Sequence, residues 1–441
     1  MSSKMQKSLL PNRRRLLLAL SGASLLPALP LAALAAAPRQ INILTSYPDE
    51  VMARFESAFE KRYPQYRIRF LWRMPHDALP YLEQQSGSET VDVYWSASPR
   101  TFARLKDQRL LRKLDIGHGT LPARIGKTQI SDPDGYYLAT EIAAYVFAWN
   151  QKKLDVLGVA PPRDWPDLVN PRLRNNIALP VPSEVGFAPV MFDIVLQAYG
   201  WKAGWAMWSE IAGLSRLVRR GSTFISDLIG SGDTAIGLSI DFFVNAAIAN
   251  GADIRQRYPI HNGINPGHIA LPLAGNNAAG AQAFAEFVLS PEGQRLLTLR
   301  DIRKLPVRPE IYTNADSNEF NPFRAAADGA MNYDGERGRW RLAVISAIFS
   351  SMLAEPHAEI SALWQRVHVA EAAGKPMAEV RQLLETPPAD EAMAESYAVK
   401  KLFYNDLEGA VATRQDIMQN WSATCAKRRA QAQALLDSAG A

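Results

Sequence analysis

The chain has 441 residues, of which 47% are hydrophobic and 21% are charged. This balance is typical of a soluble globular protein with more than one domain. The formal net charge is +5, but residues 1–35 hold five basic residues and no acidic residue, so the remaining chain has 44 of each. Because the excess positive charge lies in this leader, the composition gives no indication of nucleic acid binding.

Residues 1–35 have the pattern of an export signal. Basic residues up to Arg15 precede an apolar stretch that prolines interrupt, and its small residues fit a cleavage site before Ala36. A membrane-spanning helix is less favoured, because the apolar stretch is broken. The run NRRRLLL also resembles a twin-arginine signal, so the twin-arginine and general secretory routes both stay open. We expect the mature protein in the periplasm.

Motifs of catalysis and metal binding are missing from the sequence. The single cysteine, Cys425, excludes an intramolecular disulfide and is interpreted as a free thiol in a helix. None of the six histidines has the spacing of a metal motif, and the chain has no GxSxG, Walker A or GxGxxG pattern. We therefore predict a binding protein rather than an enzyme, with no cofactor and no metal site.

Strands and helices alternate in the first part of the mature chain. Apolar and alternating patterns predict strands over 41–47, 66–72 and 91–97. A helical pattern follows each strand. Ser46 with Asp49 fits a capping box for the first helix, and Ser98 with Pro99 fits the start of the third. The order β-α-β-α-β-α predicts a doubly wound parallel sheet.

A second set of alternating elements follows a long apolar stretch over 135–151, where we expect the chain to cross into a second lobe. Further strands are predicted over 175–183, 234–240 and 268–275. The helix after the first of these ends at Gly200. The helix after the second is expected to have Asp241 as its N-cap and Gly251 as its C-cap. The third strand is expected to return to the first lobe.

Beyond residue 330 the patterns are almost entirely helical, with a packed face at Ile360, Leu363, Trp364 and Val367. The whole chain therefore predicts an α/β fold of two doubly wound lobes with a C-terminal helical extension. We place lobe 1 at 36–138 and 269–329, lobe 2 at 139–268 and the extension at 330–441.

Polar residues recur where predicted strands turn into helices. Ligands of open α/β sheets bind beyond the carboxyl ends of the strands, where helix N-termini present unpaired N–H groups and a partial positive charge. Such ends hold Ser46, Ser98, Ser183 and Asp241. Serine is a preferred helix N-cap, so capping alone could explain each single serine. Four such junctions in two lobes also favour a small polar or anionic ligand in a cleft between them.

Few charged residues accompany these junctions. Arg219 and Arg220 precede Ser222 and Thr223, and their guanidinium groups suit phosphate or carboxylate, although a solvated strand end is the alternative. Glu141 and Asp241 are acidic residues on apolar elements. Either carboxylate could accept hydrogen bonds from ligand hydroxyls or amines, or could instead satisfy backbone donors.

Several segments resemble the periplasmic solute-binding proteins of ABC transporters. FAEFVLSPEGQRLL (284–297) and the following IRKLPVRPEIY (302–312) resemble the late helix and return segment of that family, and 136–150 resembles its crossover strand. AYGWKAGWAMW (198–208) and GLSIDFF (237–243) resemble the subgroup of ferric-ion-, hexose-phosphate- and phosphoglycerate-transport-regulatory binding proteins.

The resemblance implies the two-lobed periplasmic binding protein fold, with lobes that close on the ligand by a hinge. It implies delivery to an inner-membrane permease, or to a sensor in regulatory members. The family's ligand residues correspond by position to Thr45, Ser46, Tyr47, Ser96, Ser98, Ser183, Gly186, Ser222, Thr223 and Asp241.

Two departures from the subgroup bear on the ligand. Ferric-binding members use two adjacent tyrosines late in the second lobe, whereas the adjacent pair here is Tyr136-Tyr137 in the crossover region, and the later segment offers Tyr258. Close relatives carry Ser-Gly-Thr-Ala-His after the second-lobe strand, whereas this chain continues from Ser183 with EVGFAP. The first departure argues against iron, and the second points to a different ligand.

We therefore predict a periplasmic substrate-binding protein of an ABC transporter that captures a small anionic solute, including phosphorylated ones. The predicted partners are this ligand and a membrane permease, with no nucleic acid, and we expect a monomer. Two alternatives stay open. One is a ferric-ion carrier, and the other is a ligand-sensing partner of a two-component histidine kinase, which the helical extension suggests.

Overall fold

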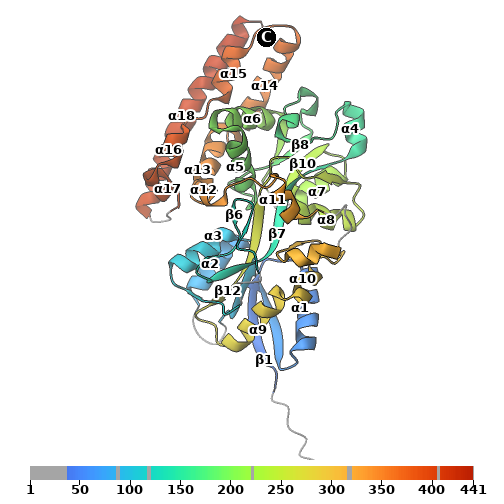
Figure 1. Ribbon diagram of the computed structural model, residues 1–441. Coiled ribbons are helices and arrows are strands. Elements are labelled where there is room, and N and C mark those ends of the chain that lie inside the picture. The colour runs from blue at the N-terminus through green and yellow to red at the C-terminus, as the bar shows by residue number, and fades with distance from the viewer. Residues whose placement is uncertain are drawn as a thin grey trace, which may run out of the picture. The chain divides into compact units, whose positions relative to one another are not determined.

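The computed structural model describes residues 37–85, 90–116, 121–219, 223–314, 320–404 and 408–440 (Figure 1). All helices and strands below belong to one unit, Pro38–Ala441. The predicted export signal and the site residues Arg220 and Ser222 lie outside the described residues, as does the side chain of Thr223.

The first part of the chain forms the predicted parallel sheet. Strand β1 pairs in parallel with β2 on one side and β3 on the other, and a helix follows each strand. The apolar face of α1, which includes Phe55 and Phe59, is fully buried under the sheet. The bounds are β1 Arg39–Thr45, α1 Asp49–Arg62, β2 Tyr66–Trp72, α2 Pro75–Glu83, β3 Val93–Ser96 and α3 Pro99–Asp107.

Two long strands, β7 (Tyr137–Trp149) and β12 (Ile264–Pro272), connect the two halves of the fold. Strand β12 pairs antiparallel with β3 and also with β7, as far as Ala144. From Tyr145 onward, β7 pairs antiparallel with β10 instead. Strand β7 thus belongs to both sheets, which confirms the predicted crossover. Our boundary at residue 139 stays a prediction.

The second sheet has the order β7-β10-β8-β9, in which β10, β8 and β9 are parallel. Gly200 follows α5 with a φ of 84°, a conformation that favours glycine. The bounds are α4 Gln151–Leu157, β8 Ile177–Pro180, α5 Ala188–Tyr199, α6 Trp201–Leu214, β9 Ser215–Val218, α7 Thr223–Gly230, β10 Ile236–Ile240, α8 Asp241–Ala249 and β11 Arg255–Arg257.

The carboxyl ends of the strands in both sheets face the middle of β7. Strand β3 ends at Ser96, opposite His268 of β12, which itself pairs with Ala139 of β7. Strand β10 ends from the other direction at Ile240, opposite Tyr145 of β7. Because parallel strands end at one edge of a sheet, the ends of β1, β8 and β9 lie at the same two edges.

The remaining elements are short strands and helices. The short strands are β4 Leu111–Arg112, β5 Arg124–Ile125, β6 Thr128–Gln129 and β13 Leu305–Pro306. Before the extension come the helices η2 Trp165–Leu168, η3 Pro171–Leu173, α9 Ala278–Leu289, α10 Pro291–Leu296, η4 Pro309–Asn314 and α11 Pro322–Ala327. The extension holds α12 Gly335–Arg339, α13 Leu342–Phe349, the π-helix η5 Ser350–Ala354, α14 His357–Ala372, α15 Ala378–Glu385, α16 Glu391–Glu395, α17 Tyr397–Tyr404 and α18 Glu408–Ser438.

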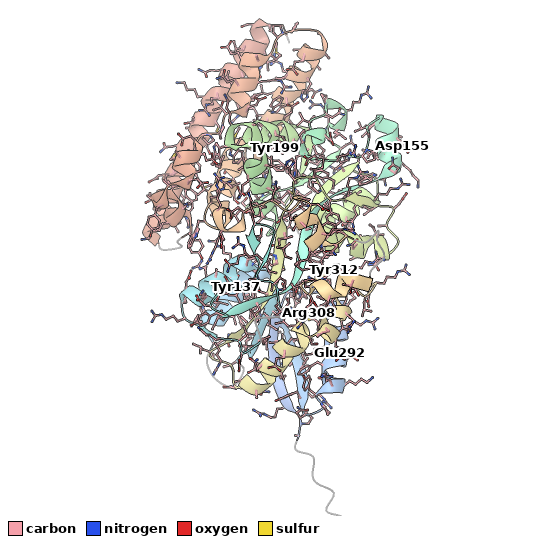
Figure 2. All side chains as sticks on the ribbon, in the orientation of Figure 1. Tyr137, Asp155, Tyr199, Glu292, Arg308 and Tyr312 are labelled. Atoms are coloured by element: carbon pink, nitrogen blue, oxygen red, sulfur yellow. The ribbon has the colours of Figure 1, made fainter. Side chains whose placement is uncertain are left out.

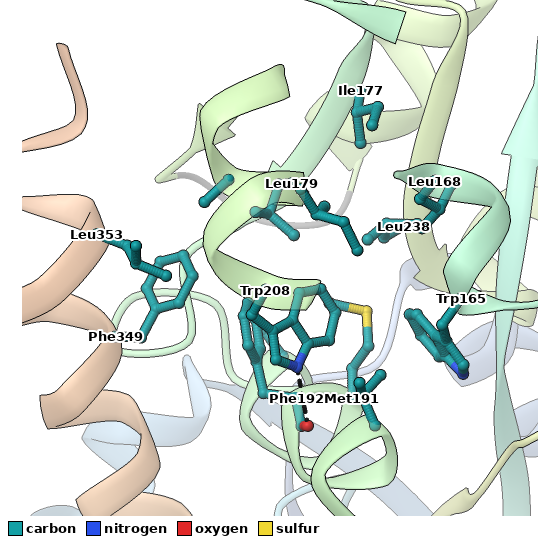
Figure 3. Close-up of a cluster of buried hydrophobic side chains, with 14 of the residues drawn as sticks. Trp165, Leu168, Ile177, Leu179, Met191, Phe192, Trp208, Leu238, Phe349 and Leu353 are labelled. Carbon is teal, nitrogen blue, oxygen red and sulfur yellow. Dashed lines mark hydrogen bonds between the residues drawn. The ribbon is translucent and has the colours of Figure 1, made fainter. Parts of the chain in front are cut away.

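The extension shares a hydrophobic core with the second sheet. Phe349 and Leu353 lie beside Phe192 and Trp208, whose indole Nε1 donates to the Phe192 carbonyl at 3.1 Å (Figure 3). Phe349 and Phe192 pack edge to face with ring centroids 4.6 Å apart. The helical tail predicted from the sequence is therefore part of the core of the second half. Among the described residues, no helix is long and apolar enough to cross a membrane.

A buried ion pair also joins the extension to α5. Arg341, just before α13, is fully buried and donates to Asp193 of α5 at 2.8 Å and to Glu395 at 2.6 Å. Glu391 lies 3.3 Å from the same guanidinium group. Arg337 pairs with Glu391 and Glu395 at the surface, where 42% of its side chain is exposed.

A second contact of this kind lies on α6. The Glu210 carboxylate, almost fully buried, bonds His368 at 2.7 Å and Arg381 at 2.6 Å. One turn further along α6, a Cβ at Gly213 would lie 2.7 Å from the Cγ of Trp364, so only glycine leaves room for that ring. The extension is thus fixed to α5 and α6 by both packing and charge.

Some predicted helix caps were wrong. The N-cap of α1 is Pro48, in an extended conformation, and the Ser46 hydroxyl instead contacts Ser96. Asp241 is the first residue of α8, whose N-cap is Ile240 and whose C-cap is Asn250 rather than Gly251. Cap positions depend on backbone angles that residue type alone does not determine.

We expect Arg341→Met to lower the free energy of unfolding by about 3–5 kcal/mol, because it leaves the Asp193 carboxylate buried without its partner. Arg337→Met is the matched control. It removes an exposed arginine that pairs with the same glutamates and is expected to cost at most about 1 kcal/mol. Urea unfolding measures both. Equal losses would contradict the assignment of Arg341 as the anchor of the extension.

Candidate functional site

A buried cluster of charged and aromatic side chains occupies the point where the two sheets meet. The Tyr47 hydroxyl donates to the Glu141 carboxylate, and the Lys304 ammonium lies 3.2 Å from the same carboxylate oxygen. The Lys304 nitrogen also lies 4.1 Å from the Tyr47 ring centre and 4.2 Å from that of Phe242. These contacts join the end of β1, the middle of β7, the segment before β13 and the start of α8.

Local backbone geometry makes this cluster possible. Strand β13 pairs with β7 so that Pro306 lies opposite Glu141, which brings Lys304 to the carboxylate. The register of β12 shifts between Gly267 and His268. A Cβ at Gly267 would overlap the Glu141 carboxylate and the Tyr47 hydroxyl, so glycine is required there. Burial and the nearby Glu141 carboxylate raise the pKa of Tyr47 well above its usual value, which keeps its hydroxyl a donor.

A group of hydroxyls gathers at the N-terminus of α3. The Ser46 and Ser96 hydroxyl oxygens lie 2.8 Å apart, as do those of Ser98 and Thr101. Ser98 is the N-cap of α3, as predicted, but its side chain makes no cap hydrogen bond. The Tyr94 hydroxyl is buried without a hydrogen-bond partner among the described residues. Burial raises its pKa to about 12, although the nearby hydroxyls oppose this shift.

Asp241 is fully buried at the end of β10. Its carboxylate accepts hydrogen bonds from the Phe242 backbone N–H at 2.7 Å and from the Tyr258 hydroxyl at 3.2 Å. Burial raises the Asp241 pKa to about 7, against the opposing effect of the Ala144 and Phe242 amides, Tyr258 and Lys304. Asp241 can therefore be present as an acid or as a carboxylate near neutral pH, and can donate or accept a proton in a hydrogen bond.

The remaining predicted residues have different surroundings. The Thr45 hydroxyl is buried and accepts from the Tyr47 N–H at 3.1 Å, which is a structural role in the loop after β1. Ser183 and Gly186 are exposed in the loop after β8, and a Cβ at Gly186 would meet nothing within 4 Å. Thr223 begins α7. The assignment of all these residues to a ligand site stays a prediction.

Sequence reasoning missed Lys304, Phe242 and Tyr258 as neighbours of the predicted acidic residues. Lys304 stands in a segment that resembles the family's return strand, but its position beside Glu141 follows from pairing between residues far apart in the chain. Phe242 directly follows the predicted site residue Asp241, and this was the one sequence feature that could have indicated its place in the cluster.

The adjacent tyrosines considered for iron lie away from this cluster. Tyr137, at the start of β7 (Figure 2), packs its ring against Phe102 and His268, with centroids 5.8 and 5.1 Å apart. Tyr136 precedes it in the same core region. In the part of the chain that the structure describes, no group of three or more histidine, cysteine, aspartate or glutamate residues could hold a metal ion.

Comparison with known families gives the class of the protein. Residues 88–326 match the family described as bacterial extracellular solute-binding protein. This match covers more than half of the chain, so the chain belongs to the bacterial extracellular solute-binding protein family. The family is described by its binding of solutes outside the cytoplasm, which implies a location in the periplasm.

Individual relatives are more distant. The phosphoglycerate transport regulatory protein PgtC of Salmonella typhimurium is 26% identical over 358 residues, which cover 81% of this chain and 88% of the relative. The fold matches the periplasmic binding protein AfuA of Actinobacillus pleuropneumoniae, solved with fructose-6-phosphate bound, at a TM-score of 0.56 and 16% identity, over 68% of this chain and 97% of AfuA. Iron-bound HitA of Pseudomonas aeruginosa matches at a TM-score of 0.55 and 16% identity, over 70% of this chain and 98% of HitA. These matches confirm the predicted two-lobed fold.

The pKa of Asp241 leads to a pH-dependent stability. The folded state holds this proton up to about pH 7, whereas the unfolded state releases it near the ordinary value of 3.8. The contribution of Asp241 to the free energy of unfolding therefore decreases as the pH rises from 3.8 to about 7, and it is constant above about pH 7. Each pH unit corresponds to about 1.4 kcal/mol. We expect the stability of Asp241→Asn relative to the wild type to rise by about 3 kcal/mol from pH 5 to pH 8.

Urea unfolding at both pH values measures this difference. Asp155→Asn is the control, because Asp155 is an exposed aspartate on α4 (Figure 2) whose carboxylate accepts from the side chain of Gln151 rather than from a residue of the cluster. A difference between Asp241→Asn and the wild type that stays constant with pH would show that Asp241 does not titrate in this range.

Proposed function

We propose that this protein is the substrate-binding component of an ABC transporter and captures a small solute with a phosphate or carboxylate group. The observation that carries this proposal is the group of hydroxyls of Ser46, Ser96 and Ser98 at the N-terminus of α3, at the edge where the strand ends of both sheets face each other. Helix α3 begins at Pro99, which has no N–H, so the hydroxyl groups supply donors beside the partial positive charge of the helix N-terminus, and together these favour an anion.

The charges of the buried cluster fit a solute that also carries hydroxyl groups. The positive charge of Lys304 is offset by Glu141, so the cluster adds little net attraction for an anion. Asp241, with a pKa of about 7, can bond a solute hydroxyl in either protonation state. We therefore assign the anionic group to the first half of the fold and the hydroxyl groups to the second.

The expected affinity agrees with the number of donors available. A micromolar dissociation constant corresponds to about 8 kcal/mol. Hydrogen bonds to a charged group contribute roughly 1.5–3 kcal/mol each. Three or four donors from the two halves are sufficient, and closure adds to this by excluding water.

The predicted lobes and partners belong to the same proposal. Lobe 1 comprises 36–138 and 269–329, lobe 2 comprises 139–268, and 330–441 is the extension. The lobes close about the crossover strands β7 and β12. The monomeric protein delivers its solute to an inner-membrane permease, after export by the twin-arginine or the general secretory route.

The similar proteins support a phosphorylated solute. PgtC is named for phosphoglycerate transport, and AfuA was solved with fructose-6-phosphate. HitA binds iron, but the tyrosine pair that this chain offers is packed in the core of the first half. We therefore propose a phosphorylated or carboxylated metabolite in preference to ferric ion.

A second candidate function is a ligand sensor for a histidine kinase. It is favoured by the extension, which shares a core with the second half and would move with it. PgtC is named a regulatory protein. Transport and sensing use the same solute site, so the two functions share the binding experiment below.

Thermal unfolding of the exported chain tests the solute class. The panel is 3-phosphoglycerate, phosphoenolpyruvate, fructose 6-phosphate and Fe(III) with carbonate. A solute at 100 times its dissociation constant stabilises the folded state by about 2.7 kcal/mol, so we expect a raised melting temperature with at least one phosphorylated compound. A shift with Fe(III) alone would contradict the proposal.

Substitution of Ser46 tests the position of the site. Ser46→Ala removes a half-buried hydroxyl at the edge of β1 and is expected to weaken binding of the active compound about tenfold, as for one hydrogen bond to a charged group. Ser438→Ala, in an exposed turn of α18, is the control. Equal affinities for the two variants in calorimetric titration would place the site elsewhere.

A further inference from the structure

The extension contacts the loops that follow strands β8 and β9 of the second sheet. Ser350 Oγ donates to Ser183 Oγ at 3.2 Å, and Ser346 Oγ lies 3.4 Å from the Pro182 carbonyl oxygen, both in the loop after β8. Arg219, directly after β9, donates from its Nη2 to the Ala354 carbonyl oxygen at 3.1 Å. Ser350 and Ala354 are the first and last residues of the π-helix η5.

These contacts lie at the edge that faces the first half of the fold. Strands β8 and β9 run parallel to β10, whose end lies opposite Tyr145 in the middle of β7. The loops that hold Ser183 and Arg219 therefore follow strand ends at this edge. The turn η5 stands beside the same edge that holds Asp241.

The geometry of η5 suits a functional role more than a purely structural one. A π-helical turn is rare and occurs frequently at functional sites. Phe349 and Leu353 of this segment are buried in the core of the second half (Figure 3), whereas Ser350 is half-buried and Ser183 is exposed. The hydroxyl groups of Ser350 and Ser183 therefore lie on the side of η5 that faces away from the hydrophobic core.

The loop after β8 needs such a donor. The residues that follow Ser183 are EVGFAP, which bring no further hydroxyl or basic side chain. Gly186 leaves open space beside the loop, since a Cβ there would meet nothing within 4 Å. Because Ser350 donates its proton to Ser183 within this pair, the Ser183 hydroxyl keeps its own proton for a solute oxygen.

We propose that the helical extension is part of the solute site: Ser350 donates to Ser183 and so holds the Ser183 hydroxyl in position to donate its own proton to the bound solute. Arg219, held by Glu184 and the Ala354 carbonyl, is its positioned positive neighbour. The pair suits a hydroxyl oxygen of the solute, in agreement with the assignment of the solute's hydroxyl groups to the second half of the fold. This inference rests on the proposed function, and it makes the extension a determinant of specificity.

The fold does not depend on Ser350. The extension is held by the buried Arg341–Asp193 ion pair, by Glu210 with Arg381, and by the shared core. Loss of one half-exposed hydroxyl therefore leaves the melting temperature of the unliganded protein unchanged. A change in affinity without a change in melting temperature separates solute contact from structural support.

Calorimetric titration of the exported chain with 3-phosphoglycerate and with fructose 6-phosphate tests the inference. We expect Ser350→Ala to weaken binding of the compound that the wild type binds about tenfold. Ser350→Thr keeps the hydroxyl and is expected to retain most of the affinity. Ser438→Ala, a serine in the same extension but away from both loops, is expected to bind like the wild type.

The outcomes separate this inference from the proposed function. Wild-type affinity in Ser350→Ala together with weakened binding in Ser46→Ala would overturn the role of the extension and leave the proposed solute site intact. Equal loss of affinity and of melting temperature in Ser350→Ala and Ser350→Thr would also overturn it, because it would show a structural effect. Failure of the wild type to bind 3-phosphoglycerate, phosphoenolpyruvate and fructose 6-phosphate alike would overturn both proposals.

Discussion

The pairing of one strand with two sheets is the constraint on which the rest of the structure depends. Strand β7 pairs with β12 in its first part and with β10 in its second, so the strand ends of both sheets meet at its middle. The Glu141 carboxylate is buried at that point and would be costly there without partners. Lys304 and Tyr47 supply them, and both approach through segments that the sheet pairing brings to β7. The candidate site therefore lies where β7 joins the two sheets.

The helical extension changes how the second half of the molecule works. Its buried arginine, its core residues and its π-helical turn all contact α5, α6 or the loops after β8 and β9. In the proposed closure of the lobes, an extension fixed in this way would move with the second half. It can then shape the solute site and also present a surface that reports closure to a membrane partner. The contacts that fix the extension to the second half would then serve both the proposed transport function and the proposed sensing function.

The sequence predicted the fold better than the site. Regular alternation of strand and helix patterns identified β1 to β3, β7 and β10, because buried parallel strands and amphipathic helices have distinct periods. The residues at strand ends were also placed correctly along the chain. Their partners were not found, since Lys304 meets Glu141, and Ser350 meets Ser183, only through packing between segments far apart in the sequence. The caps at Ser46 and Asp241 failed because residue type suggests a cap but backbone angles decide it.

We infer that the strand ends facing the middle of β7 bind an anionic solute, with its charged group at the N-terminus of α3. A crystal structure of the exported chain grown with 3-phosphoglycerate or fructose 6-phosphate tests this most directly. We expect phosphate oxygens within hydrogen-bond distance of the Ser46, Ser96 or Ser98 hydroxyls, beside the N-terminus of α3. A solute bound away from these strand ends, or a metal ion held there in place of the anion, would contradict it.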